Sequence, residues 1–204
     1  MNFTKTLLAS AALLASLGAN AAVTSSLGGS TSNFLSLSST SLDGVGTIVG
    51  GKVYNSDMTF ASLPEGTTIY EGKFLAAGIL AGEPATIAFT APVSYISFLW
   101  GSPDIENLLT VTTSSGSAQN FSASGLNFAV TDGTQSFSQY VQFKADAGST
   151  ITSLTFANVP ARDAFEVANF SVTAPVPEPE TYALMFAGLG VMGFVMRRRS
   201  NKAL

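Results

Sequence analysis

The chain has 204 residues, nine Lys and Arg against thirteen Asp and Glu, and neither cysteine nor histidine. Without those two residue types there is no cysteine nucleophile, no Ser-His-Asp triad, and no histidine or cysteine ligand for zinc, copper or haem. The net charge of −4 indicates no basic surface for nucleic acid. The kinds of catalysis that are still possible use a pair of carboxylates or a Ser-Lys arrangement.

The first 21 residues have the three parts of a secretory signal peptide. Lys5 supplies the positive charge, and residues 6–18 form an uncharged segment dominated by Leu and Ala. The cleavage pattern A-x-A follows as Ala19-Asn20-Ala21. We therefore expect an N-terminal signal helix over residues 1–21 that is removed, so that the exported chain begins at Ala22.

A segment rich in hydroxyl side chains comes next. Eleven of the eighteen residues from Thr24 to Ser41 are Ser or Thr. We interpret residues 22–41 as a lead-in that becomes a strand near Phe34. The alternative is a first strand with one polar face.

The central part of the chain, up to residue 175, reads as all-β. Short runs rich in β-branched and aromatic residues are separated by Gly, Pro, Asp or Asn, and no sustained 3.6-residue apolar period is present. Eight or nine strands of this kind favour an antiparallel β-sandwich that is jelly-roll-like. The runs are Lys52–Phe60, Thr67–Phe74, Ala85–Ala91, Val93–Trp100, Leu108–Thr113, Ser136–Lys144, Thr150–Phe156 and Phe165–Val172.

Two of these segments carry more specific predictions. Val93–Trp100 is apolar on both faces, so it should lie at the centre of a sheet. In Phe165–Val172 the apolar positions change parity, which predicts a bulge near Ala168 or Asn169. The stretch Phe74–Leu80 is the nearest to a helix in this part of the chain.

The last segment, residues 176–204, has three parts. A Pro-Glu box (Val176, Pro177, Glu178, Pro179) precedes an apolar span from Tyr182 to Met196, and Arg197, Arg198 and Arg199 follow. As a transmembrane helix the span would be about 22 Å long, short of a hydrocarbon core of roughly 30 Å. Three arginines should hold its end in the cytoplasm, and the prolines should keep the box extended. A plain C-terminal anchor is the alternative.

This tail resembles the PEP-CTERM sorting region of Gram-negative bacterial surface proteins. The resemblance implies that exosortase, a membrane-embedded cysteine protease, cuts near Val176–Pro179 after a transient stay in the inner membrane. Ser97–Thr110, Val141–Phe156 and Ala164–Val172 are similar to segments of one group of these proteins. In that group they belong to jelly-roll-like sandwiches of unassigned activity.

Four residues near the end of the central strand are candidates for a ligand site: Trp100, Asp104, Glu106 and Asn107. Together with Asp163 and Glu166 their oxygens could bind Ca²⁺, the one cofactor considered for the chain. Trp100, with Tyr95 and Tyr140, could also stack on sugar rings. The alternatives are that Trp100 packs in the core, and that Asp104 and Asn107 cap a turn while Glu106 is solvated. Asp104 with Glu166 is the carboxylate pair to consider for catalysis.

The functional hypothesis is an exported, exosortase-processed, non-enzymatic protein of the cell surface or extracellular matrix. Between Ala22 and Val176 four basic residues remain against eleven acidic ones, a net charge of −7. We therefore expect no nucleic-acid partner, and a structural or adhesive role in biofilm or floc. The alternative is a carbohydrate-binding module that recognises exopolysaccharide.

Overall fold

The computed structural model describes residues 23–174, 185–189 and 192. The predicted signal peptide with Ala19 and Ala21, the box Val176–Pro179 and the Arg197–Arg199 cluster lie outside the described residues. Residues 185–189 are helical. Within the part that the structure describes, no helix is both long and apolar enough to span a bilayer.

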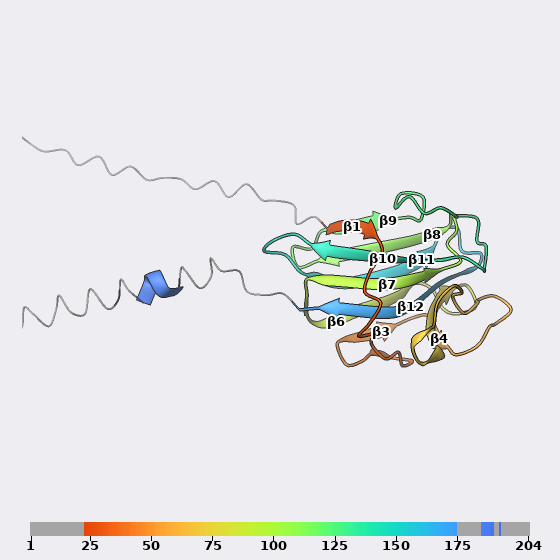
Figure 1. The fold of residues 1–204 in the computed structure, drawn as a ribbon, viewed down its shortest axis with the longest axis horizontal. Helices are drawn as coiled ribbons and strands as arrows, with labels where there is room; N and C mark the ends of the chain where they lie inside the picture. The colour runs from red at the N-terminus through yellow and green to blue at the C-terminus, as the bar shows by residue number, and fades with distance from the viewer. Residues whose placement is uncertain (1–22, 175–184, 190–191, 193–204) are drawn as a thin grey trace, which may run out of the picture.

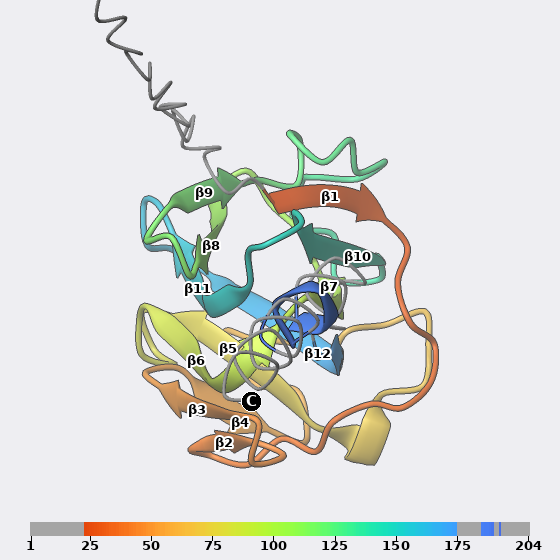
Figure 2. The same ribbon diagram turned by 90° about the vertical axis from the view of Figure 1, so that its left-hand side faces the viewer.

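Two antiparallel sheets of six strands each form the body, which confirms the all-β prediction and fits a β-sandwich (Figure 1). The strand order of the first sheet is β1 (Val23–Leu27), β10 (Ser138–Ala145), β7 (Tyr95–Gly101), β12 (Ala164–Thr173), β5 (Phe74–Gly78) and β4 (Lys52–Tyr54). The order of the second is β2 (Ser41–Leu42), β3 (Gly46–Val49), β6 (Ala85–Val93), β11 (Ile151–Asn158), β8 (Asn107–Thr113) and β9 (Ala118–Phe121). Figure 2 looks along the sandwich, with β1 and β9 side by side at one edge, where the Val23 amide donates to Gln119 Oε1 over 2.6 Å.

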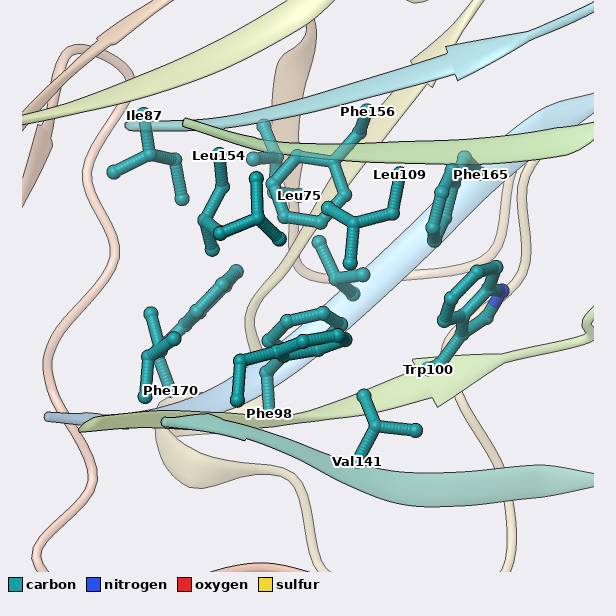
Figure 3. Close-up of a cluster of buried hydrophobic side chains, with 14 of the residues drawn as sticks. Leu75, Ile87, Phe98, Trp100, Leu109, Val141, Leu154, Phe156, Phe165 and Phe170 are labelled. Atoms are coloured by element: carbon teal, nitrogen blue, oxygen red, sulfur yellow. The ribbon is translucent and has the colours of Figure 1, made fainter. Parts of the chain in front are cut away.

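The main core lies between the two sheets and is built largely from phenylalanine (Figure 3). The ring of Phe98 lies 5.5–5.8 Å, centroid to centroid, from three other rings, those of Phe143, Phe156 and Phe170. Alternation along the strands supplies these side chains: in β8 every second residue from Asn107 to Thr113 is buried. Seven phenylalanines of the described residues are buried: Phe74, Phe98, Phe128, Phe143, Phe156, Phe165 and Phe170.

A second, smaller core covers the outer face of the first sheet. Its members come from the sheet and from the segment between β4 and β5, and they include Ala61, Ile69, Phe74, Ala76, Leu99 and Ala168. This cover explains why β7 is buried on both faces: Phe98 points to the main core and Leu99 to the smaller one. The predicted central position of Val93–Trp100 is confirmed, because β7 lies between β10 and β12.

The bulge predicted in the last strand is confirmed at Asn169. The register between β12 and β7 shifts between Ala168 and Ser171, and Asn169 has a φ of 54°. The Asn169 side chain accepts a hydrogen bond from the Tyr70 amide (2.7 Å) and donates to the carbonyl of Thr68 (2.9 Å) and the hydroxyl of Tyr140 (2.7 Å). The bulge therefore ties the covering segment to the sheet.

We expect Asn169→Gly to lower the free energy of unfolding by about 2 kcal/mol, since glycine keeps the left-handed backbone but removes the partner of three polar groups. Urea denaturation of the full chain in mild detergent, followed by circular dichroism, measures this. The matched control is Asn127→Gly, because Asn127 has a φ of 59° and is exposed. Equal losses for the two variants would show that the Asn169 contacts contribute nothing.

Several strand predictions were wrong. No strand was predicted for the residues after Phe74, but Phe74–Gly78 forms β5, all five residues of which are buried. A Cβ atom at position 78 would lie 2.4 Å from the Asp163 carbonyl oxygen, so the close approach of the two segments requires a glycine there. The strand therefore contains small residues and lacks the β-branched residues that would have predicted it. Thr67–Phe74 is mostly loop with a 3-10 turn (Tyr70–Gly72). Of the predicted Lys52–Phe60, Lys52–Tyr54 forms a strand, and Met58 makes an isolated bridge with Ala61.

The lead-in of residues 22–41 also differs from the expectation. Its strand is β1, at Val23–Leu27, and not near Phe34. Three more strands, β2, β3 and β9, were not expected at all. They are two to four residues long, and β2 and β9 lie at sheet edges, where apolar alternation is weak.

Candidate functional site

The loop between β7 and β8 is held as a turn by Asp104. One oxygen, Asp104 Oδ1, accepts hydrogen bonds from the amides of Glu106 (2.9 Å) and Asn107 (2.8 Å). The Glu106 carboxylate lies 3.8 Å from the Arg162 guanidinium and is only partly exposed. The turn-capping alternative for Asp104 is therefore confirmed.

Trp100 and Asn107 belong to a buried hydrogen-bond network. The indole nitrogen of Trp100 donates to Asn107 Oδ1 over 2.9 Å, and Asn107 Nδ2 donates to Asn158 Oδ1 over 2.8 Å. Asn158 in turn donates to the carbonyl of Asp163 (2.6 Å). This network joins the β7–β8 loop to the β11–β12 loop inside the molecule.

The hypothesis that Trp100 stacks on a sugar ring is wrong for this structure. The side chain is 0% exposed, and its ring stacks on Phe165 at a centroid distance of 4.2 Å (Figure 3). Strand alternation directs it into the main core, as the alternative interpretation held. Tyr140 is also engaged, since its hydroxyl accepts the bond from Asn169.

A small polar pocket lies beside this loop, and it brings together three carboxyl groups that the sequence analysis considered. Asp104, Asp163 and Glu166 line it, and its volume is about 100 Å³. Ser102 and Gln135 also line the pocket and were not predicted. Their sequence signal is weak, because a serine and a glutamine in loops have no distinguishing pattern.

Glu166 is the most unusual group of the pocket. It is 4% exposed, and burial is the main cause that raises its pKa to about 8. Ser102 donates to Glu166 Oε2 (2.7 Å) and the Ser62 amide to Oε1 (3.2 Å); both bonds oppose the rise, whereas the charge of Asp104 adds to it. The pKa of Asp104 is raised as well, again chiefly by burial. At neutral pH Glu166 is therefore mostly a neutral acid.

The pocket is too small for a sugar ring with its contacts, since pockets for small molecules have volumes of roughly 300–1,000 Å³. Among the described residues no three Asp or Glu side chains are grouped so as to hold a metal ion. The observed role of Glu166 is to link β12 to the β7–β8 loop and to the segment before β5. Calcium binding by Asp104, Glu106 and Asn107 stays a prediction.

The end of β12 leads directly toward the C-terminal tail. Ser94 Oγ donates to the carbonyls of Thr173 and Ala174, both over 3.1 Å, so the strand is held to its last described residue. β1 starts at the same end of the sandwich (Figure 1), because Val23 pairs with Ala145, whose amide donates to the carbonyl of Ser94. The end of β12, a strand that lies between β7 and β5, is thus fixed within the sandwich.

Comparison with known proteins identifies that following segment. Residues 175–199 match the family model of the PEP-CTERM protein-sorting motif, a range that contains the box Val176–Pro179 and the Arg197–Arg199 cluster. No curated protein and no solved structure matches the chain. The motif implies processing by exosortase, export, and transient anchoring in the membrane. The chain is therefore a β-sandwich protein that carries a PEP-CTERM sorting motif and is targeted to the surface by exosortase.

Proposed function

We propose that the sandwich is a non-enzymatic structural component of the extracellular matrix of a Gram-negative bacterium, in biofilm or floc. The observation that carries this proposal is that the sorting motif begins at residue 175, directly after a strand that lies inside a sheet. Cleavage near the box would release the intact sandwich with hardly any tail.

The buried side chains and the small pocket of the sandwich support a structural, non-enzymatic role. Its largest buried side chains are apolar or aromatic, and the carboxyl-lined pocket of about 100 Å³ has Glu166 engaged by Ser102 and Ser62. The hydroxyl-rich and acidic exterior keeps such a domain soluble at high local concentration. Both properties suit a protein that accumulates outside the cell.

A carbohydrate-binding module is the second candidate function. Trp100 is not available for it, but a different surface favours it. A groove of about 350 Å³ on the outer face of the first sheet is lined by residues with hydroxyl, amide and amino groups, among them Tyr95 and Gln142.

The matrix role predicts a loss of matrix integrity when the protein is absent. Deletion of the coding sequence in the native host should lower the biomass retained after washing, and the full chain should restore it. A deletion without effect on the retained biomass would contradict the proposal, and so would a deletion strain that the full chain does not restore.

A further inference from the structure

A patch of polar side chains lies on the part of the first sheet that the smaller core leaves open. We call Thr24, Ser26, Tyr95, Gln142 and Lys144 the polar platform. The register places Thr24 opposite Lys144 and Lys144 opposite Tyr95 in one row, with Ser26 opposite Gln142 in the next. Because neighbouring strands lie 4.7–4.9 Å apart, a row over β1, β10 and β7 extends about 10 Å.

Hydrogen bonds fix the platform in place. The Tyr95 hydroxyl donates to Gln142 Oε1 over 3.0 Å, and Gln142 Nε2 donates to Ser26 Oγ over 3.0 Å. The tyrosine, the amide and the serine therefore form a line across β7, β10 and β1. A ligand would meet these groups already ordered, which reduces the entropy lost on binding.

The surface around the platform is hollowed and elongated. The groove of about 350 Å³ is lined by the platform residues together with Ser25. A second hollow of about 300 Å³, lined by Leu27 and by residues 125–127, shares Ser25 and Ser26 with it. The two hollows share β1, and the second adds the apolar side chains of Leu27 and Leu126 to the surface next to the platform. This shape suits a chain-like ligand better than a small molecule.

The charge of the platform is unlike that of the rest of the domain. The ion pairs among the described residues involve Lys73 with Glu71, and Arg162 with Glu106. Lys144 has no carboxylate partner in the described part of the chain, and its row neighbours are Thr24 and Tyr95. Its ammonium group is therefore available to donate to an acceptor in the groove.

These properties favour one class of partner. Hydroxyl and amide groups both donate and accept hydrogen bonds, as sugar hydroxyls do, and the tyrosine offers an aromatic surface. Nucleic acid is disfavoured, since the platform has a single lysine and the domain has a net charge of −7. A protein partner needs an apolar centre, which the hydroxyl, amide and ammonium groups of the platform do not provide; Leu27 and Leu126 lie in the second hollow, outside the platform.

We propose that the polar platform binds a polysaccharide strand, with Gln142 and Tyr95 as its main contacts and Lys144 as a donor to carboxylate or hydroxyl oxygens. This inference rests on the second candidate function, the carbohydrate-binding module, and names the partner that would hold the protein in a matrix. The platform lies at the end of the sandwich where β12 finishes, since Tyr95 pairs with Thr173. A bound strand would therefore run close to the cut end.

The test uses native gels that contain deproteinised matrix polysaccharide from the producing host, with the full chain in mild detergent. The wild-type protein should be retarded, and Gln142→Ala and Tyr95→Ala should each weaken the apparent Kd about tenfold or more. Ser26→Tyr is a further variant, which fills the groove without touching the core. The fluorescence of buried Trp100 confirms that each variant is folded.

Lys144 is tested against a matched control. Lys52 is also exposed but lies on β4, at the opposite edge of the same sheet. Lys144→Met should weaken retardation and Lys52→Met should not. Gels with alginate, which carries carboxylates, and with dextran, which carries only hydroxyls, distinguish the two kinds of acceptor for Lys144. If the acceptor is a carboxylate, Lys144→Met weakens retardation more in alginate than in dextran, and added salt reduces that difference.

Two results would overturn the inference. One is a wild-type chain that the host polysaccharide does not retard; the other is retardation that Gln142→Ala, Tyr95→Ala and Ser26→Tyr leave unchanged. Neither result touches the matrix function, which the washing experiment measures separately. If the washing experiment fails while the platform variants lose retardation, the module function stands without the matrix role.

Discussion

Replacement of Trp100 by alanine is expected to lower the free energy of unfolding by about 3–5 kcal/mol, the usual cost of removing a large aromatic side chain from a core. Trp100 is 0% exposed and packs against Phe165 at 4.2 Å and Phe128 at 5.2 Å, centroid to centroid. The variant also takes the indole donor away from Asn107, whose remaining bonds hold the β7–β8 loop. A cavity and an incomplete polar network therefore act together.

Urea denaturation of the full chain in mild detergent, followed by far-ultraviolet circular dichroism, measures the loss without needing tryptophan fluorescence. The control is Ile105→Ala in the neighbouring loop. Ile105 is 74% exposed, so its truncation should change stability by less than about 0.5 kcal/mol. A loss below about 1 kcal/mol for Trp100→Ala would mean that the ring is not part of a packed core.

The Glu166→Gln substitution is expected to remove a pH dependence from folding. The pKa of Glu166 is raised to about 8 in the folded chain, against 4.5 for an unperturbed glutamate. Between these values the unfolded chain has released the proton and the folded chain still holds it. The contribution of Glu166 to the free energy of unfolding is therefore fully present below pH 4.5. It falls by about 1.4 kcal/mol per pH unit as the pH rises, and the loss is complete above pH 8.

A glutamine cannot ionise and keeps an oxygen for the Ser62 amide, while its nitrogen can face Ser102 Oγ. The variant should resemble the wild type near pH 5 and exceed its stability by on the order of 3 kcal/mol near pH 8. Melting curves of both proteins over this range measure the difference. Glu65→Gln, at an exposed carboxylate, should follow the wild-type profile. If the stability difference between Glu166→Gln and the wild type were the same at every pH, Glu166 would not be a protonated acid in the folded chain.

The sequence was most informative where one physical pattern dominates. The buried central strand was visible because β7 is apolar on both faces. The bulge at Asn169 was visible because a strand whose apolar positions change parity needs one extra residue to keep them facing the same core. The sorting motif was readable from the order of prolines, apolar span and arginines alone. Each of these signals is local and does not depend on a distant partner.

The remaining features depend on contacts between distant segments. β1 is a strand because its backbone pairs with β10, more than one hundred residues later, and its Ser and Thr side chains give no alternation. In the pocket Ser102 contacts Glu166, 64 residues away, and neither local sequence predicts that contact. The polar platform likewise exists only once the register of β1, β10 and β7 is known.

The most direct measurement of the central claim is the mass of the protein recovered from the outside of its native host. Sorting by exosortase predicts a C-terminal peptide that ends close to Pro177–Pro179, with the sandwich intact before it. A surface-exposed protein that still ends at Leu204 would contradict this processing.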